Sequence, residues 1–209
     1  MDGVIVDTAK YHFLAWQRLA KDLGVSFTEK KNEQLKGVSR VRSLEKILEW
    51  GNLELSETVF NEEMAKKNEE YLSYIEKMDT SEILPDVPRI LNLLKENKQK
   101  IALGSASKNA RTILKKVELF NDFEIIVDGT NVSKAKPNPE VFLNAAQGLN
   151  VNPEDCIVFE DSVAGIQAAN NAGMISIGIG DKANLYEADY IFKDFTEISN
   201  EFIIKMIKN

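Results

Sequence analysis

The sequence is poor in cysteine and in long apolar runs. Cys156 is the one cysteine among 209 residues, so no disulfide bond can form within the chain and we expect a reducing compartment. No stretch approaches the roughly 20 apolar residues that a membrane-spanning helix needs. The first residues also lack the pattern of a signal peptide. These absences argue against a membrane span and predict a cytoplasmic protein.

Positive charge is scarce as well. The chain holds 26 lysine and arginine residues against 33 aspartate and glutamate residues, which gives a formal net charge of -7. Proteins that bind nucleic acid or acidic membrane surfaces need a basic field, so we expect neither partner. A small anion can still bind in a local basic pocket. The length is typical of one domain with an insertion, or of two small domains.

The first third of the chain has the periodicity of helices. Apolar residues recur at spacings of three and four within residues 9–23, 41–50 and 56–78. Thr8 and Ser39 stand where helix-capping residues are expected. We therefore predict a helical block over residues 9–79.

Three cationic or titratable side chains face inward in this helical block. His12 heads an apolar stripe, where it can be a core histidine satisfied by a backbone group. Lys67 completes another stripe; either its stem packs while its ammonium reaches solvent, or its face lines a cleft that holds an anionic partner. Arg40 ends a glycine-containing turn that either binds an anionic oxygen or simply joins two helices.

The chain after residue 84 alternates between helices and short apolar strands. We expect strands at 100–104, 123–127, 156–159 and 175–179, with helices between them. This alternation predicts an α/β fold, in which a doubly wound parallel sheet carries helices on both faces. In such sheets ligands bind at the carboxyl ends of the strands.

Hydroxyl and amide groups follow the first of these strands. Ser105, Ser107 and Asn109 lie where the next helix begins, and backbone N–H groups and hydroxyls at such a position bind phosphate oxygens. Ordinary helix capping by Ser107 is compatible with that role. Further along, Lys136 adds a point charge that can balance phosphate and carboxylate.

Acidic residues lie at two other expected strand ends. Asp2 and Gly3 end an N-terminal strand of which a stub remains, although an Asp-Gly pair is also a common turn. Glu160 and Asp161 crowd two charges at one strand end, and a cation such as Mg²⁺ would neutralise them. The alternative is that one of these acids caps the helix that follows.

The order of these groups resembles the four signature motifs of the haloacid dehalogenase superfamily. The motifs are Asp2-Gly3, Ser105, Lys136-Pro137 and Glu160-Asp161. Each is weak alone, but four in order at strand ends are specific. The resemblance implies a Rossmann-like core made of residues 1–8 and 80–209, with an inserted helical cap of residues 9–79.

Finer features resemble the β-phosphoglucomutase family within that superfamily. They are the stretches Asp7 to Phe13, Gln34 to Arg40 and Ser105 to Asn109. The resemblance implies a phosphomutase that converts β-D-glucose 1-phosphate to glucose 6-phosphate through a sugar bisphosphate and an aspartyl-phosphate enzyme. Two alternatives stay open: a phosphatase of small sugar phosphates with the same core, and a non-catalytic sugar-phosphate-binding protein. We also predict a monomer.

The resemblance further implies roles for individual residues. Asp2 would exchange a proton with a sugar hydroxyl and bind Mg²⁺ through its backbone carbonyl. Asp161 would be a direct metal ligand, with Glu160 in or beside the metal's first shell. Ser105 and Lys136 would hold the phosphoryl group in transfer.

The implied substrate-binding residues come from both the cap and the core. Arg40 would bind the distal phosphate, with Ser107 and Asn109 on the core side. His12 and Lys67 would couple sugar binding to closure of the cap. The implied substrate-binding set is Thr8 at the hinge, His12, Trp16, Gly37, Arg40, Lys67, Ala106, Ser107 and Asn109.

The implied nucleophile has no position in this sequence. The resemblance places an attacking aspartate two residues before Asp2, just upstream of Met1. That upstream segment would also supply a central strand, so we expect a chain without it to fold poorly and to be inactive. The prediction is that translation starts further upstream.

Overall fold

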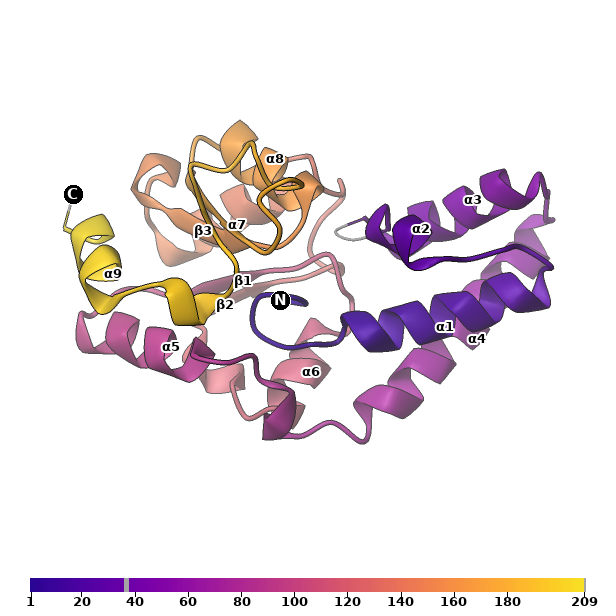
Figure 1. Ribbon diagram of the computed structural model, residues 1–209, viewed down its shortest axis with the longest axis horizontal. Helices are drawn as coiled ribbons and strands as arrows, with labels where there is room; N and C mark the ends of the chain where they lie inside the picture. The colour runs from indigo at the N-terminus through magenta and orange to yellow at the C-terminus, as the bar shows by residue number, and fades with distance from the viewer. Residues whose placement is uncertain (36–37, 209) are drawn as a thin grey trace.

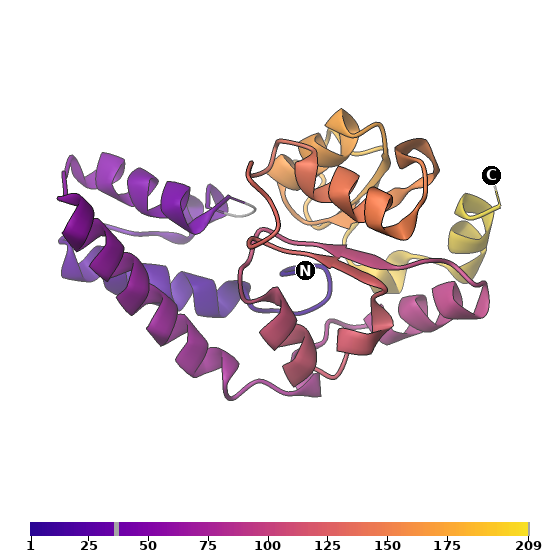
Figure 2. The ribbon, with the colours of Figure 1, turned by 180° about the vertical axis from the view of Figure 1, so that it is seen from behind.

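Within the described residues the cap is made of helices, seen to one side of the molecule in Figure 1. The computed structural model describes residues 1–35 and 38–208. The cap helices are α1 (Ala9–Asp22), α2 (Glu29–Glu33), α3 (Arg40–Gly51) and α4 (Glu57–Ile75). Helices α1 and α4 run side by side, as Figure 2 shows from behind. Apolar residues of α1, α3 and α4 enclose a small core that includes Trp16, Leu44 and Ile47, as the periodicity predicts.

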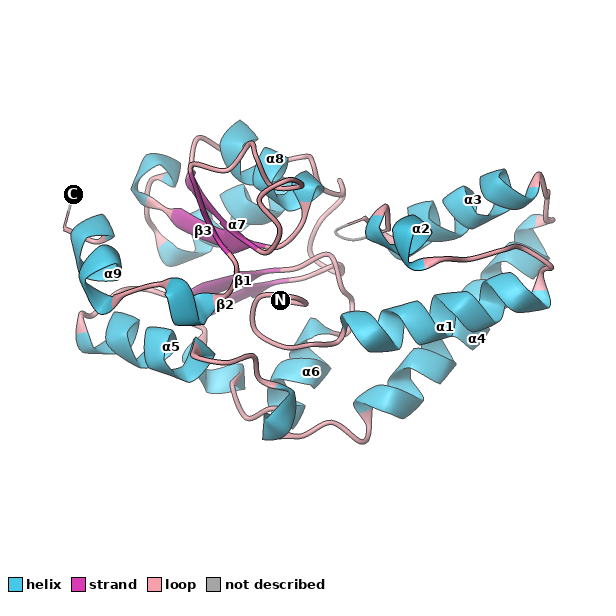
Figure 3. Ribbon diagram, viewed as in Figure 1, coloured by secondary structure: helices cyan, strands magenta, loops and turns pink. Residues whose placement is uncertain are grey.

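The remaining elements form the core, whose strands are drawn in magenta in Figure 3. The strands are β1 (Ala102–Gly104), β2 (Ile125–Val127), β3 (Ile157–Glu160), β4 (Ile175–Ile179) and β5 (Tyr190–Phe192). The helices are α5 (Val87–Glu96), α6 (Ala110–Lys116), α7 (Glu140–Leu149), α8 (Val163–Asn171) and α9 (Asn200–Met206). None of the helices in the described ranges has the length and apolar character to cross a membrane.

The strand pairs of the core are parallel, as predicted, with helices on both faces. Within the described residues they form two sheets, one of β1 and β2 and one ordered β3-β4-β5. Helix α7 packs on β1 and β2, and α8 packs on β3 and β4. Buried residues of α5 and α6, such as Ile90 and Ile113, pack in the largest apolar cluster together with Leu103 and Ile177. The strand ends that carry the predicted site residues therefore rest on packed elements.

The first residues form a turn and not the predicted strand stub. Gly3 has a φ of 66°, and its N–H donates to the carbonyl of Val6 over 2.9 Å. The pairing of this segment is limited to isolated bridges, of Asp2 with Val6 and of Val6 with Ile83. The apolar residues Val4, Ile5 and Val6 are buried in the core. The expectation of a strand ending at Asp2 was wrong, because glycine's freedom at positive φ lets the chain turn there.

Two adjacent stretches of the chain, residues 5–7 and 82–84, join the cap to the core. We call these two stretches the paired passages. The N–H of Asp7 donates to the carbonyl of Glu82 over 3.1 Å, and the N–H of Leu84 donates to the carbonyl of Ile5 over 3.0 Å. The side chain of Glu82 also accepts from Lys10 and Tyr11, at the start of α1. We propose that these paired passages are the hinge and that the cap comprises residues 9–79.

Thr8 does not cap α1 as expected. Its φ of -96° and ψ of -4° are helical, whereas a capping side chain needs an extended backbone to reach the first turn. The Thr8 hydroxyl is instead buried and has no hydrogen-bond partner. Ser39, with an extended backbone, does cap α3 by accepting from the N–H of Arg42 over 3.3 Å.

Candidate active site

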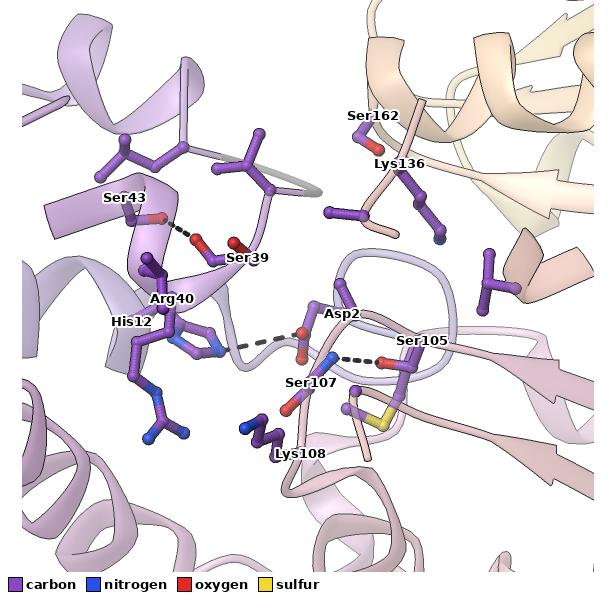
Figure 4. Close-up of a pocket in the computed structure, with 18 of the residues that line it drawn as sticks. Asp2, His12, Ser39, Arg40, Ser43, Ser105, Ser107, Lys108, Lys136 and Ser162 are labelled. Carbon is purple, nitrogen blue, oxygen red and sulfur yellow. Dashed lines mark hydrogen bonds and ion pairs between the residues drawn. The ribbon is translucent and has the colours of Figure 1, made fainter. Parts of the chain in front are cut away.

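A cavity of about 310 Å³ lies between cap and core. Its walls contain these predicted site residues: Asp2, His12, Trp16, Arg40, Lys67, Ser105, Ala106, Ser107, Lys136, Glu160 and Asp161. Figure 4 shows Asp2 between cap residues, such as His12 and Arg40, and core residues, such as Ser105 and Lys136. Thr8 and Asn109 lie outside the cavity wall. The predicted site residue Gly37 lies outside the described residues.

Lys136 and Glu160 form a buried ion pair on the core side of the cavity. The Lys136 ammonium donates to Glu160 Oε1, and each residue is less than 10% exposed. Glu160 Oε2 accepts from the backbone N–H groups of Asp161 and Ser162 and from the Ser162 hydroxyl. Burial acts to raise the pKa of Glu160, but the nearby Lys136 ammonium and the hydrogen-bond donors outweigh it and lower that pKa. Glu160 is therefore ionised and holds Lys136 at the cavity wall.

The loop after β1 is held in shape by its own hydroxyls. The N–H of Ser107 donates to Ser105 Oγ over 3.1 Å, and the N–H of Asn109 donates to Ser107 Oγ over 3.2 Å. Lys108 also lines the cavity, although the sequence analysis gave it no role. Lys108 could have been predicted as a cavity residue, because it lies between the predicted site residues Ser107 and Asn109. This loop brings hydroxyl groups and one ammonium to the same wall.

Asp2 has one oxygen of its carboxyl group buried, while its side chain as a whole is 29% exposed. Its Oδ1 is buried without a partner, and its Oδ2 lies 3.9 Å from His12 Nε2. Burial is the largest effect on Asp2 and raises its pKa, while the Lys67 and Lys136 ammonium groups act against it. A carboxyl with a raised pKa retains a proton more readily than an exposed one. Asp2 is thus equipped to give and take a proton.

His12 of the cap lies between the buried Lys67 and the carboxyl group of Asp2. The Lys67 ammonium lies 3.0 Å from His12 Nδ1 and 4.5 Å from the centre of the Trp16 ring, and Lys67 is 3% exposed. The His12 ring stacks on Tyr71 with centroids 4.1 Å apart. Lys67 therefore faces inward and does not extend its ammonium to solvent, and its partners are aromatic rings and an imidazole.

Burial and like charge lower the pKa of both His12 and Lys67. Burial, followed by the charges of Lys67 and Arg40, lowers the pKa of His12 well below its ordinary value. Burial and Arg40 lower the pKa of Lys67 to about 7. His12 is therefore neutral, and its Nδ1 accepts from Lys67. Its proton then sits on Nε2, the nitrogen that faces Asp2.

The acids of the core side have the chemistry of a magnesium site. The Asp161 carboxylate lies so close to Gly3 that a Cβ there would stand 2.1 Å from Asp161 Oδ2. The buried Asp2 Oδ1 lacks a partner nearby. The described residues contain no group of three histidine, cysteine or acidic residues placed to hold a metal. Mg²⁺ needs one or two carboxylates, because waters and substrate phosphate complete its octahedron, so the Asp161 carboxylate, beside the predicted backbone carbonyl ligand of Asp2, suits this ion.

The sequence also matches a known family over most of its length. The model of haloacid dehalogenase-like hydrolases matches residues 1–173. The chain belongs to this family. The predicted family resemblance and the predicted α/β fold class are therefore confirmed.

Individual relatives narrow the similarity within the haloacid dehalogenase-like hydrolases. The chain is 41% identical to the β-phosphoglucomutase of Bacillus subtilis over 205 residues, which are 97% of this chain and 91% of that protein. It is 31% identical to a phosphorylated carbohydrates phosphatase of Thermotoga maritima, over 83% of this chain and 79% of the relative. The crystal structure of β-phosphoglucomutase from Clostridium difficile superposes with a TM-score of 0.94, at 42% identity, over 99% of this chain and 94% of that one. The protein is thus a β-phosphoglucomutase-like member of an enzyme family that also includes phosphatases.

Proposed function

We propose that the protein is a phosphomutase that converts β-D-glucose 1-phosphate to glucose 6-phosphate through a sugar bisphosphate. The observation that carries this proposal is the placement of cations on both sides of Asp2. Figure 4 shows Lys136 above Asp2, and Arg40 and Lys108 below it. A mutase must hold two phosphate groups of one sugar at the same time. Cations on opposite sides of an acid-base carboxyl suit that requirement.

Each side chain then has a definite task in the reaction. Lys136 and Ser105 hold the phosphoryl group in transfer, with Glu160 keeping the Lys136 ammonium in place. Asp2 takes the proton of the attacking sugar hydroxyl and returns it in the reverse direction. Arg40 binds the phosphate that does not react, and the binding energy closes the cap and excludes water.

Mg²⁺ is the proposed cofactor. Asp161 and Asp2 would hold it, and it would neutralise the negative charge that builds up on the phosphoryl group. We expect Asp161→Ala to abolish turnover while leaving the protein folded. The control is Glu154→Ala, which removes an exposed acid near the same strand. A coupled assay of glucose 6-phosphate with circular dichroism checks both variants, and full activity of folded Asp161→Ala would remove this residue from the metal site.

The nucleophile is part of the same proposal. Phosphoryl transfer through an aspartyl phosphate needs a carboxylate that attacks phosphorus, and Asp2 cannot be both that group and the acid-base group. The family resemblance places the attacking aspartate two positions upstream of Asp2.

A phosphatase of small sugar phosphates is the second candidate. The observation in its favour is the 31% identity to the Thermotoga maritima phosphatase. The two activities differ in what accepts the phosphoryl group, which is a sugar hydroxyl in a mutase and water in a phosphatase. Cap residues that bind a second phosphate favour the mutase, because a phosphatase does not need them.

The deciding experiment follows both products from one substrate. The protein, with its upstream strand and aspartate, is incubated with β-glucose 1-phosphate, Mg²⁺ and a trace of glucose 1,6-bisphosphate. Glucose 6-phosphate and inorganic phosphate are then measured in parallel. We expect glucose 6-phosphate to form much faster than inorganic phosphate. Release of inorganic phosphate alone would establish the phosphatase, and neither product would leave the non-catalytic binding protein.

A further inference from the structure

The ring of Phe142 faces the ammonium group of Lys136 from behind the cavity wall. Lys136 Nζ lies over this ring, 4.7 Å from its centroid. Phe142 is on α7 and is 6% exposed, and Lys136 is 7% exposed. The cavity wall, in the part of the chain that the structure describes, includes Lys136 but not Phe142. Phe142 can therefore act on a ligand only through Lys136.

The place of this ring depends on Gly104, the last residue of β1. A Cβ on Gly104 would stand 2.9 Å from the Cδ1 and Cε1 atoms of Phe142, closer than real Cβ atoms approach other atoms. The ring also packs in an apolar cluster with Val127, Val158 and Ala169, which belong to β2, β3 and α8. Packing against strands and a helix thus fixes the ring, and no ligand is needed to hold it.

The other partners of the Lys136 ammonium are oxygen atoms. It donates to Glu160 Oε1 and, over a long 3.5 Å, to the carbonyl of Gly104. An ammonium group has three N–H donors, so these two bonds leave one N–H for an oxygen atom in the cavity. Lysine has a flexible four-carbon stem, so its head can turn from the cavity unless its surroundings hold it there.

An aromatic ring holds an ammonium group without using up an N–H donor. The attraction comes from the negative face of the ring, and it is strongest where water is excluded. Another carboxylate in this place would take the remaining N–H and reduce the positive charge that faces the cavity. An aliphatic side chain would fill the space without the attraction. The ring of Phe142 is therefore suited to keep the Lys136 ammonium in place and its third N–H open.

We propose that Phe142 is a positioning residue, whose ring face holds the Lys136 ammonium toward the phosphoryl group in transfer. The task of Lys136 rests on the proposed function. The role of Phe142 deepens that function, because Lys136 belongs to the core and would act in the same way whether a sugar hydroxyl or water accepts the phosphoryl group. The phosphatase alternative would use the ring as well.

The test replaces Phe142 with phenylalanines that carry one, two or three fluorine atoms on the ring, and it measures glucose 6-phosphate and inorganic phosphate as in the deciding experiment. Fluorine draws charge from the ring face and changes the shape of the ring little, so the attraction weakens while the packing stays. We expect kcat to fall stepwise, by roughly tenfold over the series. KM and the melting temperature should change little, because Arg40 and the apolar cluster are untouched.

Two leucine variants separate this contact from general packing. Phe142→Leu should lower kcat at least as much as the ring with three fluorine atoms. The matched control is Phe195→Leu, which removes another buried ring that is 4% exposed and packs against Phe159. This control should lose stability by a similar amount, while kcat of the folded protein stays close to that of the wild type.

The outcomes distinguish the role of Phe142 from the proposed function. An unchanged kcat across the fluorinated series, in an active enzyme, would overturn the role of Phe142 alone. Release of inorganic phosphate alone, falling stepwise with fluorination, would support Phe142 and overturn the mutase. No product from the wild type would overturn both.

Discussion

Gly3 and Asp161 are packed so closely that position 3 admits no side chain. The backbone of Gly3 has a φ of 66°, and a Cβ there would stand 2.1 Å from Asp161 Oδ2. The Asp-Gly pair therefore does more than form a turn. It lets the backbone beside Asp2 approach the acid that we propose as a metal ligand.

We expect Gly3→Ala to destabilise the protein by about 2–4 kcal/mol, from backbone strain together with the clash against Asp161. Gly24→Ala is the matched control, because Gly24 has a φ of 71° but nothing within 4 Å of a new Cβ. It should lose about 1–2 kcal/mol, from strain alone. Urea unfolding of both variants measures the difference. Equal losses would mean that Asp161 moves aside without cost.

Lys67 lowers the stability of the folded state, because its ammonium is buried at the cavity. Its pKa is about 7 when folded, against an ordinary value of 10.5. Between these pH values the unfolded chain binds more protons than the folded one, so stability rises with pH across that window. Below pH 7 the ammonium is buried at full cost, offset in part by the Trp16 and Tyr71 rings.

We therefore expect Lys67→Met to be more stable than the wild type by up to a few kcal/mol at about pH 6, and to lose mutase activity. The difference should shrink as the pH rises through this window and be smallest above pH 10.5, where the lysine is neutral in both the folded and the unfolded chain. Urea unfolding at both pH values tests this. A stability difference that does not change with pH would show that Lys67 is not buried as an ammonium ion.

At the scale of elements, α4 joins three parts of the site. Lys67 reaches the cavity, Asn68 binds the core loop, and Tyr71 supports the His12 ring. Helix α3 adds Arg40 at its first turn, where Ser39 caps it. Because these residues belong to the cap, their effect on the reaction depends on the cap being closed over the substrate.

Arg40→Ala should therefore reduce mutase turnover far more than hydrolysis of a small aryl phosphate. The aryl phosphate has no second phosphate, so it gains nothing from Arg40. Arg42→Ala is the matched control, since Arg42 lies on the same helix with its guanidinium paired to Glu45 and Glu49. Turnover of both substrates is compared for each variant. Equal losses in both assays for Arg40→Ala would count against the mutase.

The sequence predicted most elements because their signals are local. The stripe of α4 and the capping by Ser39 follow from spacing and from hydrogen bonds within one turn. The predictions missed β5 and α9, which follow residue 189 and lack a strong period of their own. The capping by Thr8 was wrong because packing at the hinge, and not the local sequence, sets its backbone.

Ser105, Lys136 and Glu160 of the candidate site could be predicted, because the order of the motifs along the chain singles them out. The sequence could not show that Glu160 has both oxygens engaged, because that depends on the folded position of Lys136. It also could not show that Asn109 contacts Asn68, since these residues are 41 positions apart. Contacts between cap and core join residues far apart in the sequence, so the periodicity of the sequence does not indicate them.

At the scale of the whole molecule, the core lines the cavity with acids, hydroxyl groups and Lys136. The cap lines it with the aromatic rings of His12 and Trp16. The cavity needs both parts, and one chain provides them. We therefore propose that the protein acts as a monomer.

We expect a chain without an attacking aspartate to show no mutase or phosphatase activity, because an aspartyl phosphate cannot form without that carboxylate. A chain extended upstream by an apolar strand that ends in aspartate should show activity and a higher melting temperature, because that strand would add to the core. The matched control is the same extension ending in asparagine, which should restore stability without turnover. Activity of the unextended chain would require another nucleophile and would end the aspartyl-phosphate proposal.

The paired passages at the hinge make the cap exchangeable. Val6 pairs with Ile83, so the chain leaves the core and returns to it at neighbouring points. Everything between these points could be replaced by the corresponding segment of a relative without lengthening or shortening the core. Such an exchange would alter the cap wall of the cavity and leave the core wall, with Ser105, Lys136 and Glu160, unchanged. A single recombination that spans the cap could change what the enzyme accepts and leave its reaction intact.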